Sequence, residues 1–197
     1  MPLTVPAPWT CTADVKPGSP LRFRLVWTRP PADDPLRLIS VVMYNPAFEG
    51  EVYGYNATVQ HSAVTRSTPM VRDGATHRQV RSLLADATEI RVVNLSPVRT
   101  TKPVEARRAC KALVDRDVEL QQAHALAWAC EATTVVAAWG AGPFTARMER
   151  SRAEVLRLAC GRLWCWGTTQ EGHPLHPSPL GRVGVGAELV RFGVGWG

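Results

Sequence analysis

The chain has 197 residues, 45% of them hydrophobic and 20% charged, which is the composition of a folded protein with room for a single domain. No window holds 18 consecutive apolar residues, and the first residues lack the pattern of a secretory signal, so we expect a cytoplasmic protein without a membrane span. The net charge of +6 comes mostly from arginine, because only three of the 23 basic residues are lysines. Arginine binds phosphate in a bidentate way, so the bias suits a polyanionic partner, although a GC-rich genome would produce it equally well.

The five cysteines are irregularly spaced and include no Cys-x-x-Cys pair. Zinc sites and iron–sulfur clusters need a tighter grouping of cysteines, so we expect no metal and no cofactor. Four of the five lie within apolar runs, where reduced and buried thiols are expected: Cys110, Cys130, Cys160 and Cys165.

The first 37 residues predict a proline-rich segment that packs on the core of the protein. Half of the 16 prolines fall before residue 36. Residues 21–27 alternate between polar and apolar side chains, which predicts a half-buried edge strand. Residues 38–197 are expected to form one α/β domain, and no internal repeat is visible.

Four short apolar runs follow, and each has the length of a buried strand. They cover residues 38–45, 89–95, 133–139 and 162–167. Helical stretches separate them at residues 75–87, 103–131 (with a break near Asp115) and 144–160, the last with Met148, Val155, Leu156 and Ala159 facing inward. Strands that alternate with helices imply right-handed crossovers, so we expect a three-layer αβα fold with a four-stranded, mainly parallel sheet. Residues 181–197 are glycine-rich and predict a loop with a short closing element.

Polar side chains with chemical potential stand where the predicted strands end. Asn45 ends the first apolar run, Asn94 lies at the end of the second, and His176 lies in a proline-rich loop after the fourth. Ligands of open parallel sheets bind at the carboxyl ends of the strands. We therefore expect these three side chains to surround one cleft.

The motifs at these strand ends resemble those of the uracil-DNA glycosylase superfamily. One segment reads as the second motif of that superfamily: His176-Pro177-Ser178-Pro179-Leu180. Asn45-Pro46-Ala47 is similar to the first motif of its mismatch-specific branch, and the apolar strand that ends near Asn94 is similar to the strand whose asparagine reads the flipped base. The resemblance covers roughly residues 38–182. It implies a uracil-DNA-glycosylase-like fold and a monomeric, monofunctional DNA glycosylase without cofactor, which acts on a pyrimidine flipped out of double-stranded or single-stranded DNA.

The resemblance also implies roles for three side chains. His176 would donate a hydrogen bond to O2 of the leaving pyrimidine, for which a neutral imidazole suffices. Asn45 would hold the attacking water, where the fastest members of the superfamily carry an aspartate. Asn94 would read the Watson–Crick edge of the base, because a carboxamide offers both a donor and an acceptor.

The remaining expected site residues fall into two groups. The base would lie against Tyr44, Pro46, Ala47 and Phe48. Because Ala47 stands where uracil-specific members carry a blocking tyrosine, a base with a C5 substituent could enter, such as hydroxymethylcytosine or its glucosylated form in phage DNA, which would make this an enzyme of anti-phage defence. The DNA would lie against Pro177, Ser178, Pro179, Leu180 and Arg182, with the leucine as a wedge in the duplex.

Other interpretations of the same residues stay open. The chain could be a uracil or mismatch repair glycosylase, a non-catalytic DNA-binding module, or a nucleotide-processing enzyme, although a free nucleotide needs no wedge such as Leu180. The other histidines are expected at the surface or on helices: His61, His77 and His124. The arginines of residues 147–152 are expected on a solvated helix face.

Overall fold

The structure is a computed structural model that describes residues 9–15, 21–29, 37–45, 65–68, 75–100, 102–178, 183–184 and 186–193. Eight strands lie in this part of the chain: β1 (Thr10–Val15), β2 (Arg22–Thr28), β3 (Leu38–Met43), β4 (Thr65–Thr68), β5 (Glu89–Asn94), β6 (Thr134–Ala138), β7 (Leu163–Cys165) and β8 (Val190–Arg191). Four helices accompany them: α1 (Ala75–Leu83), α2 (Pro103–Ala112), α3 (Arg116–Cys130) and α4 (Ala146–Leu158).

The strands form one mixed sheet in the order β4-β1-β2-β5-β3-β6-β7-β8. The predicted four-stranded, mainly parallel sheet is therefore wrong, although the α/β class is right. The four expected strands do run parallel in the middle of the sheet, as β5, β3, β6 and β7. Antiparallel strands extend both sides: β2, β1 and β4 beyond β5, and β8 beyond β7.

The strand at residues 22–28 lies inside the sheet rather than at its edge. It pairs with β1 on one side and with β5 on the other. Its alternating sequence predicted a half-buried edge strand, and in the structure Arg24 and Val26 are only partly buried. The guanidinium of Arg24 lies 4.9 Å from the ring centre of Trp128 on α3, so a helix covers this face of the strand as well.

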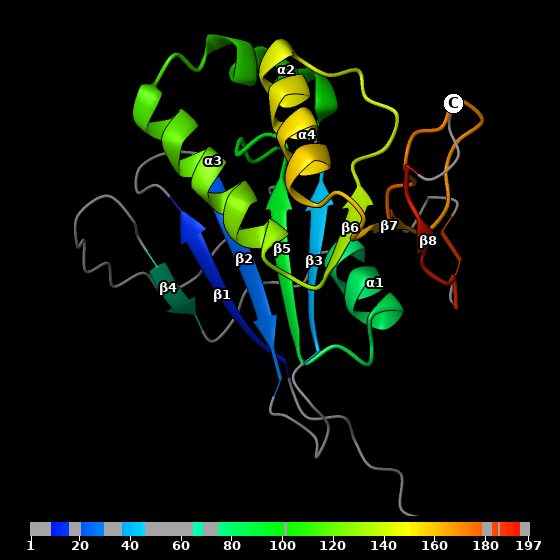
Figure 1. Cartoon of the computed structure of the whole chain (residues 1–197). Helices are drawn as coiled ribbons and strands as arrows, with labels where there is room; N and C mark the ends of the chain where they lie inside the picture. The colour runs from blue at the N-terminus through cyan, green and yellow to red at the C-terminus, as the bar shows by residue number, and fades with distance from the viewer. Residues whose placement is uncertain are drawn as a thin grey trace, which may run out of the picture.

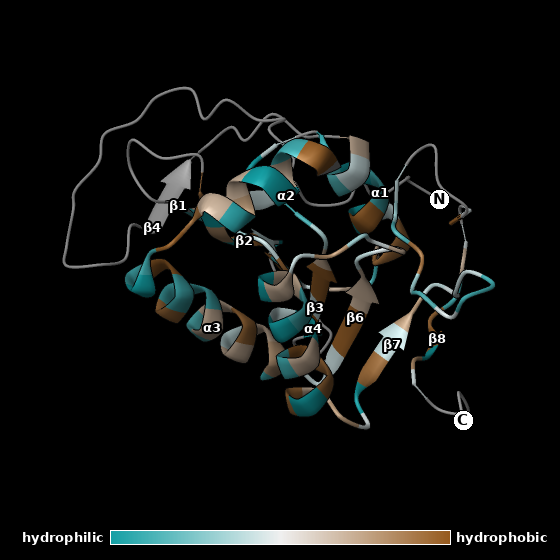
Figure 2. Cartoon of the chain, turned by 90° about the horizontal axis from the view of Figure 1, so that it is seen from above, coloured by the Kyte–Doolittle hydropathy of each residue, from teal (hydrophilic) through white to brown (hydrophobic). Residues whose placement is uncertain are grey.

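Helices cover both faces of the sheet, with α3 and α4 in front of it and α1 behind it (Figure 1). Apolar strand residues alternate between the two faces, as expected for strands that are buried on both sides. The α1-side core joins Ile39, Val41, Met43, Val80, Leu84, Ile90, Val92, Val136 and Ala138. The α3-side core joins Val42, Val93, Leu95, Ala125, Leu126, Val135, Ala137, Met148 and Val155. In Figure 2 the central strands are accordingly coloured mostly brown, for hydrophobic residues, and the helices around them carry teal, hydrophilic residues on their outer sides.

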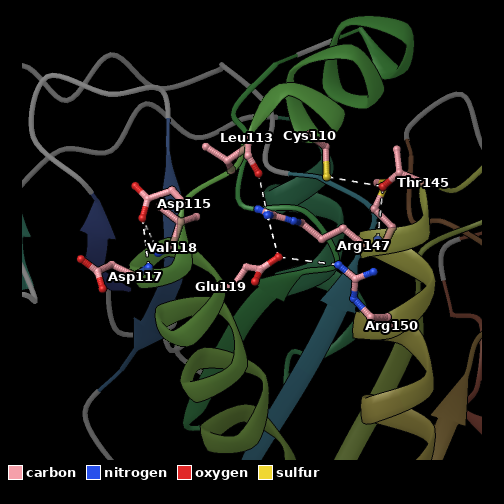
Figure 3. A network of polar contacts seen from close by, with 10 residues as sticks. Cys110, Leu113, Asp115, Asp117, Val118, Glu119, Thr145, Arg147 and Arg150 are labelled. Atoms are coloured by element: carbon pink, nitrogen blue, oxygen red, sulfur yellow. Dashed lines mark hydrogen bonds and ion pairs between the residues drawn. The ribbon is translucent and has the colours of Figure 1, made fainter.

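The long helical stretch breaks where the sequence predicted it, between α2 and α3. Asp115 caps α3 by accepting hydrogen bonds from the backbone N–H groups of Asp117 and Val118, at 3.0 and 3.3 Å. Across this break, Nη2 of Arg147 donates to the carbonyl of Leu113 (2.6 Å) and to Glu119 (2.8 Å), as Figure 3 shows. Arg147 therefore joins α2, α3 and α4 instead of pointing into solvent as expected.

Two further expectations about burial differ from the structure. Leu156 is 40% exposed, because the buried face of α4 consists of Met148, Ser151 and Val155, followed by Ala159. Cys160 is exposed, whereas the other four cysteines are buried, and all five are free thiols. Cys160 directly follows the end of α4, where the chain leaves the core for a turn.

Candidate functional site at the carboxyl edge of the sheet

The carboxyl ends of three parallel strands lie side by side and bring the predicted site residues to one edge of the sheet. Met43 at the end of β3 pairs with Asn94 at the end of β5 and with Ala138 at the end of β6. Asn45 and Gly140 each stand two residues beyond such a pair. Because neighbouring strands are about 5 Å apart, the chain segments that lead to Asn45 and to Gly140 leave the sheet side by side.

A tight loop after β7 carries His176 to the same edge. The loop is closed by hydrogen bonds from the backbone N–H of Leu175 to the carbonyl of Gly167 (2.9 Å) and from that of Thr169 to the carbonyl of His173 (2.8 Å). A side chain on Gly140 would begin 3.6 Å from Cβ of His176, so the histidine packs directly on this glycine. Gly140 has a φ of +75°, which glycine adopts without strain and which turns the chain away as β6 ends.

The amide of Asn45 is held by the loop that follows β5. Its Nδ2 donates a hydrogen bond of 2.6 Å to the carbonyl oxygen of Thr100. Thr100 is itself anchored to the start of α2, because its hydroxyl donates to Glu105 (3.1 Å) and accepts from the backbone N–H of Lys102 (3.1 Å). The orientation of the Asn45 side chain is therefore fixed by two neighbouring segments.

Asn94 is an almost fully buried polar residue, with 1% of its surface exposed. It shares its strand parity with Ile90 and Val92, which belong to the α1-side core, so its side chain points to the α1 face of the sheet. Its carbonyl oxygen on the backbone accepts a 2.5 Å hydrogen bond from Gln122, but its side-chain oxygen Oδ1 has no hydrogen-bond partner among the described residues. A buried acceptor without a partner is rare in folded proteins, so this oxygen is a candidate for a bond to a ligand or to an ordered water.

Two residues that sequence reasoning did not place in the site also lie on this face. His77 of α1 is 3% exposed, its ring centre lies 6.3 Å from that of Trp27, and its Nδ1 has no hydrogen-bond partner in the part of the chain that the structure describes. Arg22 of β2 is 5% exposed, and its Nε and Nη2 likewise have no partner in that part of the chain. In the predicted helix, His77 stands on the same face as the apolar Val80 and Leu84. This spacing is the signal in the sequence that could have indicated its burial.

The two histidines of the site are neutral at physiological pH. Burial, assisted by the charges of Arg22, Arg81 and His176, lowers the pKa of His77 to about 3. Burial also lowers the pKa of His176 below its ordinary value. His176 is the smallest of these influences on His77, after burial, Arg22 and Arg81.

The other predicted site residues are distributed unevenly. The ring of Tyr44 lies on the α3-side core, where its hydroxyl donates to the carbonyl of Pro143 (2.5 Å) and burial raises its pKa. Pro177 is buried, and the backbone N–H of Ser178 donates to the carbonyl of His176 (2.8 Å). The remaining six lie outside the described residues: Pro46, Ala47, Phe48, Pro179, Leu180 and Arg182.

The described residues include no group of three or more His, Cys, Asp or Glu side chains that could hold a metal ion. In the same part of the chain, no helix is long and apolar enough to cross a membrane. The described residues bring two amides, two neutral imidazoles and a guanidinium to this edge.

Comparison with known proteins identifies the family of the chain. The model of a family described as "Protein of unknown function (DUF1643)" matches residues 65–178, which is more than half of the chain, so the chain belongs to this family. No curated protein and no solved structure matches. The expected membership of the uracil-DNA glycosylase superfamily is wrong, because the match is to DUF1643 and nothing connects the chain to that superfamily. The wrong expectation came from short motifs at strand ends, and proline-rich turns after parallel strands arise in unrelated α/β proteins as well.

Proposed function

We propose that this DUF1643 protein is a monofunctional DNA glycosylase that hydrolyses the N-glycosidic bond of a flipped pyrimidine and leaves an abasic site. In this proposal it acts in the cytoplasm as a monomer and without a cofactor. The observation that carries the proposal is the buried side chain of Asn94, whose oxygen lacks a partner at the edge of the sheet that also bears His176 and Asn45. The proposal rests on these side chains and not on a family relationship.

The burial of Asn94 supports a base as its ligand. An amide oxygen that is removed from water without a hydrogen bond costs about 1–3 kcal/mol, so a ligand group that donates to Oδ1 of Asn94 would recover this free energy. A pyrimidine edge presents donors and acceptors in one plane, and a carboxamide matches them with its own donor and acceptor. Base edges of this kind are accessible only when the nucleotide leaves the stack.

His176 supplies the group that would stabilise the leaving base. Bond cleavage places negative charge on the pyrimidine, and a donor fixed in a site from which water is excluded stabilises that charge without reorganising. Because burial keeps the pKa of His176 below its ordinary value, the imidazole is a neutral donor at pH 7. A neutral imidazole still carries one N–H, so His176 can donate this hydrogen bond without an acidic residue beside it to stabilise a protonated ring.

Asn45 would position the attacking water. Its amide is fixed through Nδ2 to the carbonyl of Thr100, and it stands beyond β3, between the strand of Asn94 and the strand that leads to Gly140 under His176. An amide lacks the negative charge of an aspartate and offsets no positive charge on the sugar. We therefore expect a slow enzyme, whose rate comes chiefly from stabilising the leaving group.

The substrate is proposed to carry a substituent at C5, with hydroxymethylcytosine or its glucosylated form in phage DNA as the leading examples and anti-phage defence as the role. This part rests on the sequence alone, since Ala47 lies outside the described residues. Uracil or mismatch repair is the alternative within the same chemistry. A non-catalytic DNA-binding module is favoured as a second candidate by the amide of Asn45, which stands where a carboxylate would be the stronger catalyst.

Duplex oligonucleotides that carry one uracil, hydroxymethylcytosine or glucosylated hydroxymethylcytosine test the proposal when treated with the protein and then with alkali. Strand cleavage is expected at a modified base, and Asn45→Ala and His176→Ala should reduce single-turnover rates by at least about 100-fold while DNA binding is retained. His124→Ala, at an exposed position of α3, is the matched control and should leave the rate unchanged. Binding without cleavage of any duplex would favour the non-catalytic module, and an unchanged rate in either site variant would contradict the role of that residue.

A further inference from the structure

Arg22 is a buried cation that the proposed base release does not use. Only 5% of its surface is exposed, although it stands at the first position of β2. Its backbone N–H donates to the carbonyl of Pro97 (2.9 Å), so the residue is fixed in the sheet beside the strand that ends in Asn94. Charged side chains are almost never buried to this extent unless they are paired.

An irregularity in β2 directs Arg22 to the α1 face. The register between β1 and β2 shifts between Asp14 and Val15, which leaves Phe23 without a partner in β1. Phe23 and Arg24 both lie on the α3 side, in the α3-side core and over Trp128 respectively, so Arg22 takes the opposite side. Extra residues of this kind re-aim a side chain and are frequent next to functional sites.

The guanidinium presents one complete edge without a partner. The atoms Nε and Nη2 are both buried and make no hydrogen bond to any residue that the structure describes. These two nitrogens point their N–H groups in parallel, and this is the edge that binds two oxygens of a phosphate or carboxylate at once. A structural arginine in a core would be expected to direct this edge at backbone carbonyls or a carboxylate.

Among the described residues, the surroundings of Arg22 add a positive charge and no carboxylate, and only Cys11 acts in the opposite direction. Burial, followed by the charge of Arg99, lowers the pKa of Arg22 to about 10, which leaves it protonated at neutral pH. Its charge reaches His77, which is also under the influence of Arg81 and His176. No Asp or Glu of the described residues forms an ion pair with Arg22. Within the described residues this cation has no carboxylate partner, and an anionic ligand would stabilise it.

We propose that Arg22, with His77 beside it, is a binding site for a phosphoryl group on the α1 face of the carboxyl edge. Two oxygens of the phosphoryl group accept from Nε and Nη2 of Arg22, and His77 supplies a neutral imidazole that can donate a further hydrogen bond. A phosphoryl group fits better than a carboxylate because Arg99 adds a second positive charge, which suits a dianion. The inference holds whichever base is released and does not depend on base release.

Isothermal titration of inorganic phosphate into the full chain tests this site, at constant ionic strength and in a buffer without oxyanions. The wild type is expected to bind phosphate, and Arg22→Gln should weaken binding roughly 10- to 100-fold, because the charge-assisted pair of hydrogen bonds is lost. Arg22→Lys keeps the charge but not the parallel N–H pair, and an intermediate affinity is expected. Arg24→Gln, on the same strand but on the α3 face, is the matched control and should bind as the wild type does.

The possible ligands are separated by three further titrations. Deoxycytidine monophosphate that binds more tightly than phosphate, with no binding of deoxycytidine, would assign the site to the phosphate of a nucleotide. A phosphorylated single strand that binds best would assign it to a strand of DNA, and equal affinity for all phosphates would assign it to phosphate itself. The inference is overturned if the wild type does not bind any of them, if Arg22→Gln binds as tightly as the wild type, or if acetate binds as tightly as phosphate.

Discussion

Replacement of Arg22 by methionine is expected to stabilise the protein when no anion is bound. Methionine fills most of the volume of the arginine side chain and needs no hydrogen-bond partner. Most buried polar residues behave in the opposite way, because their removal leaves other groups unpaired. For Arg22, no described group depends on Nε or Nη2, so the substitution removes a cost and leaves no orphaned partner.

The magnitude follows from the burial of the charge. Burial lowers the pKa of Arg22 from 12.5 to about 10, which at about 1.4 kcal/mol per pH unit means that the charged form is disfavoured in the native state by roughly 3 kcal/mol. Removal of the charge recovers this free energy, and imperfect packing of methionine offsets part of it. We expect the free energy of unfolding to rise by about 2 kcal/mol and Tm to rise by about 4–8 °C for a domain of this size.

Urea and thermal unfolding at pH 7.5 in a chloride buffer without phosphate measure this effect. Arg24→Met is the control, because Arg24 is partly exposed, lies 3.7 Å from Asp14 and packs on Trp128, so its loss should be neutral or destabilising by up to about 1 kcal/mol. Added phosphate should stabilise the wild type and reduce the difference from Arg22→Met. A loss of 1 kcal/mol or more in Arg22→Met without phosphate would refute the reasoning, since it would show that the guanidinium is satisfied within the chain.

Three further predictions concern the rest of the structure. The pKa of His77 is lowered to about 3, so the unfolded state takes up a proton near pH 6.5 that the native state does not, and stability is lost as the pH falls. In urea unfolding between pH 7 and 5, the wild type should lose about 2 kcal/mol more stability than His77→Phe. The control variant His124→Phe should lose as much as the wild type. Arg147→Met should lower the free energy of unfolding by about 1–3 kcal/mol, because it removes hydrogen bonds to Leu113 and Glu119. The side chain of Arg150 is 69% exposed, so the control variant Arg150→Met should change this free energy by less than about 0.5 kcal/mol. Equal effects of the two substitutions would contradict the role of Arg147 between the helices. Ala47→Tyr should reduce the rate on a C5-modified base relative to uracil in the same assay, and an equal loss on both would show that Ala47 does not line the C5 side of the pocket.

The middle of the fold was predictable from local patterns. Short apolar runs rich in valine, such as the one that ends at Asn94, predicted β5, β3, β6 and β7, and Asp115 predicted the break between α2 and α3, because a cap leaves a clear local signal. The extent of the sheet was not predictable in this way. Strands β1 and β4 are short and polar, and β2 reads as an edge strand because it alternates, although β1 and α3 cover it.

The candidate site was predictable only where its residues follow strand ends. Asn94 and His176 stand after apolar runs, so their common edge follows from parallel pairing. Arg22 and His77 come from a strand and a helix whose positions depend on long-range pairing and on the register shift at Phe23. No local pattern in the sequence distinguishes Arg22 from an ordinary surface arginine, and only the helical spacing of His77 with Val80 and Leu84 hints that this histidine is buried.

The most direct test of the central claim is the identification of the base that the protein releases. Oligonucleotides with uracil, cytosine, hydroxymethylcytosine and glucosylated hydroxymethylcytosine would be mixed with the wild type or with Asn94→Ala, and the free bases measured by mass spectrometry. The wild type is predicted to release a C5-modified base, and Asn94→Ala to release it at least about 100-fold more slowly, because the buried amide that reads the base is gone. The absence of any free base with the wild type, or its release at the same rate by Asn94→Ala, would contradict the account.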